Sequence, residues 1–236
     1  MEEKQRINKF LAQKGVGSRR EIDKYIEMEM IKVNGVLATS GQKVDEHDEI
    51  EFNGKIISSQ KEKKEYFMIN KPQGYISAVK DLREKTVVEL IDCQERIYPV
   101  GRLDLNTEGL LILTNDGDCY NKLIHPRAEI WKTYKAKVWG RVTEEEVKIL
   151  QEGIELEEGK TLPAKVILER AYDNSSWVEI SIREGRNRQI RRMLKAIGHH
   201  VIYLKREKIG ELTIGNLEAG QYRELYQDEL EYIFSL

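Results

Sequence analysis

The sequence is poor in cysteine, and its positive and negative charges nearly cancel. In a chain of 236 residues the two cysteines, Cys93 and Cys119, belong to no Cys-x-x-Cys pair. Neither a disulfide framework nor a zinc site is therefore indicated, and we interpret both as reduced thiols of a reducing compartment. The net charge of −2 shows no excess of basic residues over the chain as a whole. Any surface for a polyanion must therefore be local.

Long apolar runs are also missing. The N-terminus, MEEKQRINKF, lacks the apolar stretch of a signal peptide, and a run such as Leu110–Leu113 is far shorter than the ~20 residues that cross a membrane. A hydrophobic fraction of 40% and a charged fraction of 34% are ordinary for a soluble protein. We expect a cytoplasmic protein with no membrane segment.

Motifs for nucleotides and metals are absent too. The chain has neither a Walker loop nor a Gly-x-Gly-x-x-Gly that opens a helix. His199 and His200 are adjacent, so in a strand they would point to opposite faces. Asp116-Gly117-Asp118 could hold a metal but is first of all a turn signal. We expect no nucleotide, no cofactor and no metal.

The N-terminal part resembles a separate small unit. A helix fits residues 7–13, and Ser18 with Glu21 forms a capping-box pattern that predicts a second helix start. Four apolar residues continue that helix at helical spacing, namely Ile22, Tyr25, Ile26 and Met30. Asn34-Gly35 between two β-prone triplets predicts a tight hairpin, because the turn needs positive φ at both central residues.

These patterns divide the chain into two domains. The predicted helix–helix–hairpin unit covers residues 1–59, a polar linker covers 60–65, and the second domain covers 66–236. In the second domain, strands are predicted at 66–69, 109–114, 133–138, 164–171 and 177–183, and helices at 117–124, 144–151 and 188–197. Thr143 with Glu146 is another capping box, and Asn174-Ser175 predicts an antiparallel hairpin. Strands in runs mixed with helices indicate an α+β fold.

Two segments are locally basic. Arg19 and Arg20 lie on the first turn of the second predicted helix, where free N–H groups suit phosphate, and Lys24 follows one turn later. The alternative is a solvated charged face, offset by Glu21 and Asp23.

The helix predicted at 188–197 carries the second basic segment. An apolar stripe comprises Ile190, Met193, Leu194 and Ile197, and a stripe of four cations comprises Arg188, Arg191, Arg192 and Lys195. The two stripes differ by two residues, about 200° of helical rotation, so they lie on opposite faces. Since little acid compensates these cations, a polyanion is the expected partner. A merely soluble helix is the alternative.

Asp104 is the candidate for chemistry. It lies in a loop between Leu103 and Leu105, where an ionised carboxylate needs a partner. Arg191 would keep it ionised and oriented. The alternative is an ordinary turn or cap residue. Tyr134, between Lys132 and Lys135, could stack on an unpaired base, although a structural tyrosine is commoner on this pattern alone.

Four segments together carry a resemblance. INKPQG (69–74), GRLDLNTEGLLILTNDG (101–117), KTY (132–134) and EGRNRQIRRM (184–193) occur in this order. They closely resemble the bacterial rRNA pseudouridine synthases of the RsuA family. RINKFLAQKGVGSRREIDKYI and KVNG resemble the RNA-binding domain named after ribosomal protein S-four, which precedes the catalytic domain in that family.

The resemblance implies a site and a fold. Asp104 would be the catalytic residue, Tyr134 would stack on the target base, Arg191 would pair with Asp104, and Leu204, matched less securely, would line the pocket. Arg102 and Arg186 join the other cations as expected RNA contacts. The sheet would be mixed and largely antiparallel, and the enzyme would use no metal or cofactor.

The implied function is isomerisation of one uridine of ribosomal RNA to pseudouridine, in naked RNA or in a ribosome assembly intermediate. Asn106-Thr107 and the Arg-Asn-Arg run at 186–188 slightly favour the large-subunit RNA. A non-catalytic RNA-binding factor for ribosome assembly is the alternative, and an RNA hydrolase lacks its metal ligands or activated nucleophile. We expect a monomer. The sequence does not identify the uridine, or whether the carboxylate attacks the ribose or the base.

Overall fold

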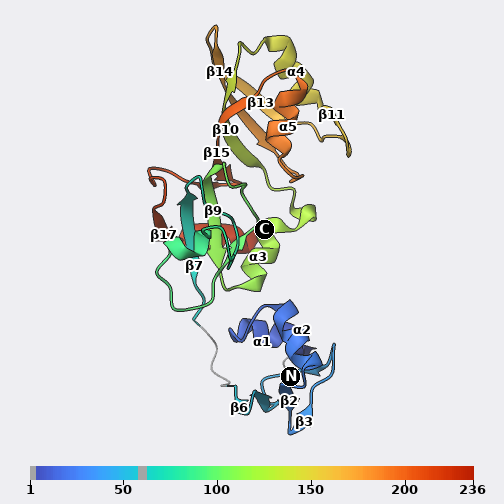
Figure 1. The fold of residues 1–236 in the computed structure, drawn as a ribbon. Helices are drawn as coiled ribbons and strands as arrows, with labels where there is room; N and C mark the ends of the chain where they lie inside the picture. Colours follow the sequence, from blue (N-terminus) through green and yellow to red (C-terminus); the bar gives the residue numbers. More distant parts are fainter. Residues whose placement is uncertain (1–3, 58–62) are drawn as a thin grey trace. The chain divides into compact units, whose positions relative to one another are not determined.

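A computed structural model describes residues 4–57 and 63–236 (Figure 1). The chain divides into two compact units with a boundary between Lys64 and Glu65, and the segment Cys93–Arg96 groups with the first. Residues 60–62 of the predicted linker lie outside the described part. Within the described part, no helix is both long and apolar enough to span a membrane.

The first unit begins with two helices. A short strand β1 (Gln5–Arg6) leads into α1 (Ile7–Gln13), which has the predicted bounds, and α2 (Arg19–Glu27) follows. The predicted capping box at the start of α2 is formed, with the Ser18 hydroxyl accepting from Glu21 N and the Glu21 carboxylate accepting from Ser18 N. Met30 was wrongly predicted as part of this helix. The helix ends at Glu27, and Glu29 has a left-handed φ of 57°, which stops helical propagation.

The rest of this unit is a small sheet. β2 (Ile31–Val33) and β3 (Val36–Leu37) form the predicted hairpin, with φ of 51° at Asn34 and 79° at Gly35. The sheet order is β3-β2-β5-β6, with β5 (Ile50–Phe52) and β6 (Lys55–Ile56), while β4 (Lys43–Val44) pairs with β1. Apolar residues from both helices and the sheet form one core, including Ile7, Leu11, Ile22, Ile31 and Val44. The unit therefore has a core of its own.

The second unit is built on one mixed sheet, for which the described residues supply nine strands. One half contains β7 (Tyr66–Lys71), β8 (Tyr98–Val100), β9 (Glu108–Thr114) and β17 (Tyr222–Glu224), with α3 (Gly117–Ile124) and α6 (Gln227–Ser235). Met68, Leu110, Ile112 and Leu123 belong to its core, together with Ile233. Short 3-10 helices lie at Val87–Leu90 and Pro126–Ala128.

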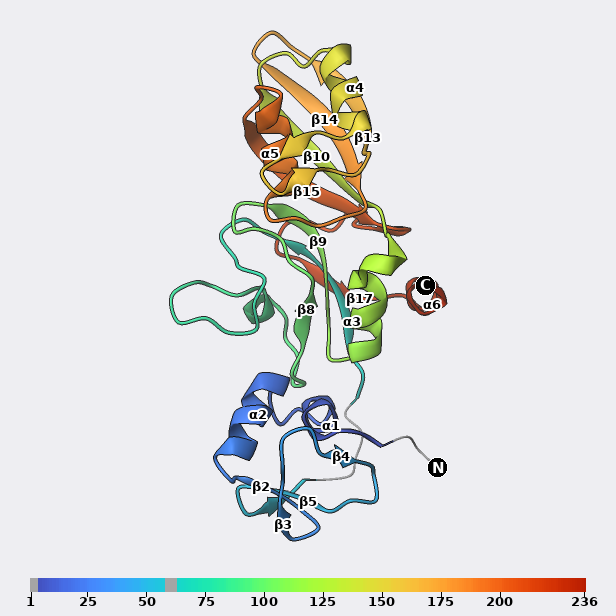
Figure 2. The same cartoon turned by 90° about the vertical axis from the view of Figure 1, so that its right-hand side faces the viewer.

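The other half has the chain order β10 (Lys132–Trp139), α4 (Glu144–Glu152), β13 (Lys165–Ala171), β14 (Ser175–Ile182), α5 (Gln189–Ala196) and β15 (Val201–Ile209). The strand order is β13-β14-β10-β15, so this half is a split βαβ arrangement of the ferredoxin-like kind. Figure 2 shows α4 and α5 on the same face of these strands. A small hairpin, β11 (Glu155–Leu156) and β12 (Gly159–Lys160), follows α4, and β16 (Leu212–Thr213) pairs with β15.

The two halves join at a narrow seam. β15 pairs with β9 in parallel through Lys205↔Glu108 and Arg206↔Gly109, whereas the other pairings of the described strands are antiparallel. Gly109 makes this close approach possible. A Cβ on it would lie 2.2 Å from the backbone oxygen of Arg206, and its φ of 122° disfavours other residues. The sheet is mixed and largely antiparallel, which confirms the predicted α+β class.

The predicted elements of this unit are confirmed, and α3 has the predicted bounds, 117–124. Asp116 caps α3 by accepting a hydrogen bond from Asp118 N, so Asp116-Gly117-Asp118 begins a helix.

Candidate active site

The site is built around one row of residues that crosses the seam. The register places Lys71 of β7 opposite Gly109, Gly109 opposite Arg206, and Arg206 opposite Tyr134 of β10. Residues paired in neighbouring strands point to the same face of a sheet, so the side chains of Lys71, Arg206 and Tyr134 share a face. All three are buried, Lys71 completely. The row brings a tyrosine and two cations together from segments far apart in sequence.

The loop that carries Asp104 runs from β8 to β9 and is fixed through its backbone. The Ser77 hydroxyl bonds to both the N–H and the carbonyl oxygen of Leu103, each at 3.0 Å. On the other side of Asp104, the Leu105 carbonyl accepts a hydrogen bond of 2.8 Å from Gly74 N. The segment after β7 therefore holds the residues on both sides of Asp104.

Two cations bind the end of the same loop. The Lys71 ammonium donates to the Thr107 carbonyl at 2.9 Å and to the Pro72 carbonyl at 2.8 Å. Arg191 of α5 donates from Nη2 to the Asn106 carbonyl at 2.7 Å. Since these donors come from a strand end and from a helix, the loop conformation depends on both halves of the unit. Contacts of this kind hold a functional side chain in one geometry before a substrate binds.

Asp104 forms its ion pair with Arg188. The Arg188 Nη1 atom lies 3.8 Å from Asp104 Oδ2, and 32% of the Asp104 side chain is exposed. The Nη2 donor of Arg191 is directed to the Asn106 carbonyl in this structure, and the pairing of Arg191 with Asp104 stays a prediction. Arg188 has a left-handed backbone, with φ of 48°, at the N-cap of α5. Strained residues of this kind concentrate at functional sites.

The electrostatics of the site follow from burial. Burial lowers the pKa of Lys71 to about 8, although Asp104 and Glu108 act to raise it. Burial, followed by repulsion from Arg188, lowers the pKa of Arg191, while Asp104 raises it. The charges of Lys71 and Arg191 therefore both interact with the Asp104 carboxylate.

Leu204 and Arg206 extend the site along β15. Leu204 is 3% exposed and lies opposite Ala136, two register positions from the Arg206–Tyr134 pair and therefore on the same face of the sheet. The Arg206 Nε donates to the Leu110 carbonyl at 2.8 Å. Lys71 and Arg206 were not among the site residues predicted from the sequence. The only signal was their position, within INKPQG and two residues after Leu204.

Only part of the basic face of α5 is free of contacts with other protein groups, and so available to a polyanion. Its apolar stripe is confirmed, since Ile190, Met193 and Leu194 are buried. Arg192, however, donates to both carboxylate oxygens of Glu158 at 2.5–2.6 Å. Arg186 donates to Glu184 and to the carbonyls of Gly159 and Lys160. The expectation of little compensating acid is therefore wrong for Arg192, which pairs with Glu158 beside the β11–β12 hairpin, and Arg186 is likewise engaged.

The other predicted RNA contacts are open to solvent. Lys195 and Arg102 are exposed, and no side-chain hydrogen bond or ion pair is seen for either in the part of the chain that the structure describes. In the first unit, Arg19, Arg20 and Lys24 of α2 are exposed as well. The side chains predicted to contact RNA are therefore accessible in each unit.

A carboxylate on a fixed loop among cations, a buried tyrosine on the adjoining sheet row, and a separate unit with exposed arginines are features of an RNA-modifying enzyme. Residues 65–196 match the RNA pseudouridylate synthase family, and residues 5–50 match the S4 domain. The chain belongs to the RNA pseudouridine synthase family, whose members are isomerases. This confirms the resemblance found in the sequence.

Similar proteins cover almost the whole chain. The chain is 46% identical to the ribosomal large subunit pseudouridine synthase B of Bacillus subtilis (strain 168), over 98% of the chain and 96% of that protein. It is 34% identical to the dual-specificity RNA pseudouridine synthase RluF of Escherichia coli (strain K12), over 98% of the chain and 79% of that protein. A crystal structure of a pseudouridylate synthase superposes with a TM-score of 0.71 at 33% identity, covering 97% of this chain and 99% of that one.

Proposed function

We propose that this protein converts a uridine of ribosomal RNA to pseudouridine, with Asp104 as the catalytic residue. One observation carries the assignment. Asp104 is the carboxylate on a loop whose backbone is bound by Ser77, Gly74, Lys71 and Arg191, next to the row that contains Tyr134. A carboxylate that needed only to cap a turn would not require donors from so many elements.

The substrate follows from the relatives. Because the large-subunit synthase of Bacillus subtilis is 46% identical over nearly the full length of both chains, we favour large-subunit ribosomal RNA, naked or in an assembly intermediate. Residues 1–59 would bind that RNA through Arg19, Arg20 and Lys24, and residues 66–236 would carry out the reaction. Ribosomal RNA as substrate favours a cytoplasmic location, and we expect a monomer.

The reaction can be written with the residues of the site. The bond between uracil N1 and the ribose anomeric carbon breaks, the base rotates, and a bond forms from uracil C5 to that carbon. The hydrogen at C5 leaves as a proton and N1 gains one, so no electrons are transferred to an acceptor. The Asp104 carboxylate would act as a covalent nucleophile on the ribose or on the base.

Binding must first take the uridine out of its stack, which requires a few kcal/mol. Stacking of the base on Tyr134 offsets part of that, with Leu204 lining the pocket. Arg102, Arg188 and Lys195 would contact the backbone of the RNA, and Arg191 would hold the Asp104 loop. These contacts make binding sensitive to salt.

Tritium release tests the proposal. Both ribosomal RNAs are transcribed with tritium at uracil C5 and incubated with wild-type protein and with Asp104→Asn. Release from the large-subunit RNA by wild type alone, with unchanged RNA affinity of the variant, is the expected result. Release by Asp104→Asn would disprove the catalytic assignment. If neither naked RNA nor assembly intermediates released tritium, the protein would be a binding factor instead.

A further inference from the structure

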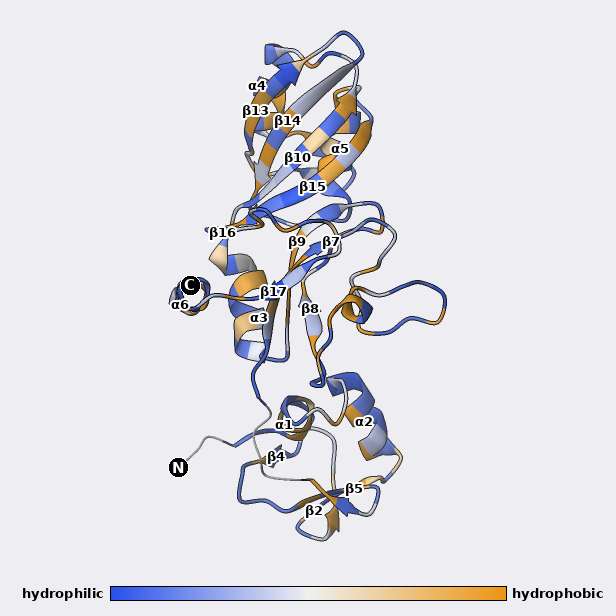
Figure 3. Cartoon of the chain, turned by 90° about the vertical axis from the view of Figure 1, so that its left-hand side faces the viewer, coloured by the Kyte–Doolittle hydropathy of each residue, from blue (hydrophilic) through white to orange (hydrophobic). Residues whose placement is uncertain are grey.

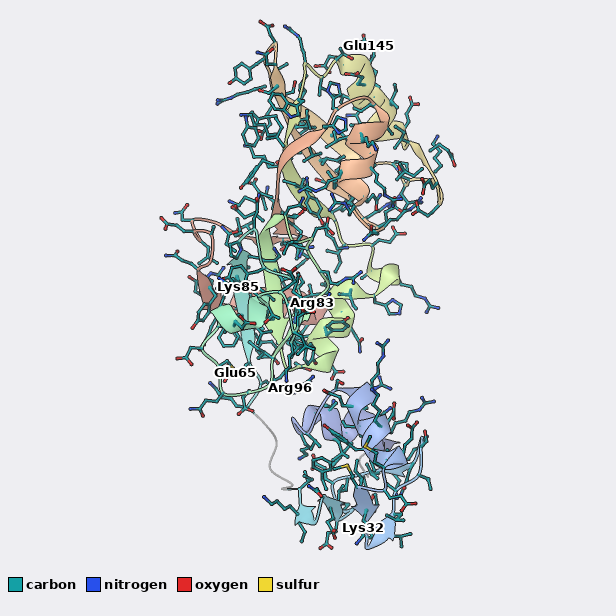
Figure 4. All side chains as sticks on the ribbon, viewed as in Figure 1. Lys32, Glu65, Arg83, Lys85, Arg96 and Glu145 are labelled. Carbon is teal, nitrogen blue, oxygen red and sulfur yellow. The ribbon has the colours of Figure 1, made fainter. Side chains whose placement is uncertain are left out.

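Among the described residues of the second unit, the half of the sheet with the order β13-β14-β10-β15 has one face without helices. α4 and α5 cover one side of these strands, and Figure 3 shows the opposite side facing the viewer with no helix in front of it. Figure 4 shows side chains projecting from this open side, while Glu145 marks α4 on the covered side. The row of Lys71, Arg206 and Tyr134 lies on the covered face, because the side chain of Tyr134 points to the same side as the buried Ala136 and Val138.

Aromatic and basic residues alternate across this open face. The register places Tyr203, Lys137, Trp177 and Arg170 in one row across all four strands. The Trp177 ring is partly exposed and meets the Tyr203 ring edge-on at 6.1 Å. The ammonium groups of Lys135 and Lys137 lie 5.6 and 5.8 Å from the centroid of the Trp177 ring. An indole is therefore bordered by cations at the centre of the face.

The charge of this face is positive although the chain as a whole is not. By strand alternation, six cations of the described strands project here, namely Lys135, Lys137, Lys165, Arg170, Lys205 and Lys208. Four carboxylates accompany them, from Glu169, Glu179, Glu207 and the neighbouring Glu108 of β9, which accepts a hydrogen bond from the Tyr203 hydroxyl, and Glu169 pairs with Lys135 at 2.8 Å. The face has two positive charges in excess, which a polyanion would complement.

We propose that this open face binds a single-stranded segment of the RNA substrate, with Trp177 stacking on a base and Lys137 and Arg170 contacting phosphates. A four-stranded ferredoxin-like sheet with aromatic residues on its central strands is a general solution for holding unstacked bases. Basic residues beside a stacking ring distinguish such a surface from a protein contact, whose centre is depleted in lysine. This surface lies on the side of the sheet away from Asp104, and it rests on the proposed RNA substrate.

The test measures affinity without turnover, so it does not depend on the catalytic assignment. Two fluorescent probes are used: an RNA hairpin with a single-stranded extension of about twelve nucleotides, and the same hairpin without it. Binding by the full chain is followed by anisotropy over a range of salt concentrations. The variants are Trp177→Leu, Lys137→Gln and, as a matched control, Lys148→Gln, which changes an exposed lysine of α4 on the covered side.

We expect the substitutions to weaken binding of the hairpin with the single-stranded extension and not of the bare hairpin. Trp177→Leu should weaken binding of the extended hairpin on the order of tenfold and leave the bare hairpin unaffected. Lys137→Gln should weaken the same complex a few-fold and reduce the magnitude of its salt slope by about 0.7. Lys148→Gln should match wild type with both probes.

Three results would overturn the proposal. Equal affinity of Trp177→Leu and wild type for the extended hairpin would show that no base stacks there. An equal loss with both probes would show that the substitution acts through the fold or the catalytic face, and Lys137→Gln then provides the second check. A wild-type dimer that Trp177→Leu dissociates, with RNA affinity unchanged, would assign the face to contacts between copies of the chain.

Discussion

The Lys71 ammonium donates a 2.9 Å hydrogen bond to the carbonyl of Thr107, which follows Asp104 in the same turn, and the side chain of Lys71 is completely buried. The hydrogen bond from Thr107 N to the Asp104 carbonyl, at 3.0 Å, closes that turn. A buried lysine thus supports the backbone beneath the candidate catalytic carboxylate.

Lys71 should make stability depend on pH in the alkaline range. Its pKa is about 8 in the folded protein and near its ordinary value of 10.5 in the unfolded chain. Between these values the unfolded state binds more protons, so stability rises with pH. Wild type should therefore gain stability relative to Lys71→Met between about pH 8 and 10. Urea denaturation of both proteins at several pH values measures this difference, and a constant difference would contradict the prediction.

Arg191 should matter more for turnover than Arg188. Arg191→Lys loses the 2.7 Å bond to the Asn106 carbonyl, and a displacement of the Asp104 loop by about 1 Å should lower kcat on the order of 100-fold. Arg188→Lys is the matched variant. Its contact with Asp104 is long and solvent-accessible, so a change of only a few-fold is expected. Tritium release at saturating RNA gives both values, and the reverse order would show that Arg188 is the more important partner.

Gly109 should be the least replaceable of the glycines near the site. Alanine there would place its Cβ against the Arg206 backbone and open the seam, with an expected loss of unfolding free energy on the order of 3–5 kcal/mol. Gly74→Ala is the control. Gly74 also has a positive φ, of 83°, but a Cβ would meet open space, so about 1–2 kcal/mol is expected. Chemical denaturation compares the two, and similar losses would mean that the seam adjusts easily.

Glu158 should compete with RNA for Arg192. Glu158→Gln removes the carboxylate that both short bonds from Arg192 reach, and it frees a cation for phosphate. RNA affinity should rise a few-fold, and the salt slope should steepen by up to about 0.9. Glu157→Gln removes the same charge from the neighbouring exposed residue and should have a smaller effect. Identical effects of the two variants would indicate general electrostatics instead of release of Arg192.

Local signals in the sequence predicted the elements that they specify. The capping boxes at Ser18 and Thr143 and the Asn34-Gly35 turn depend on neighbouring residues, and each is formed in the structure. Strand β8 has only three residues and includes Pro99, so it gave no alternating pattern. It is defined by its partner β9 instead.

The sequence predicted which residues belong to the candidate site better than it predicted which residues they contact. Asp104, Tyr134 and Leu204 stood in recognisable segments, but their approach depends on long-range strand register. The pairing of Arg188 with Asp104 and of Arg192 with Glu158 joins segments far apart in sequence, and no local rule specifies it. The burial of Lys71 was not predictable, because lysine is rarely buried without partners. Its two partners are backbone carbonyls, of Pro72 and Thr107, which the sequence pattern does not reveal.

The seam between β9 and β15 also determines when the protein can become active during its synthesis. Glu108 and Lys205 are about a hundred residues apart, so this pairing closes a long loop and forms late in folding. The half that contains β9 is also completed late, because its strand β17 and helix α6 follow β15 in the sequence. The residues that hold the Asp104 loop, Arg191 among them, come together only after nearly the whole chain has emerged, so a truncated nascent chain contains the RNA-binding unit but no complete site.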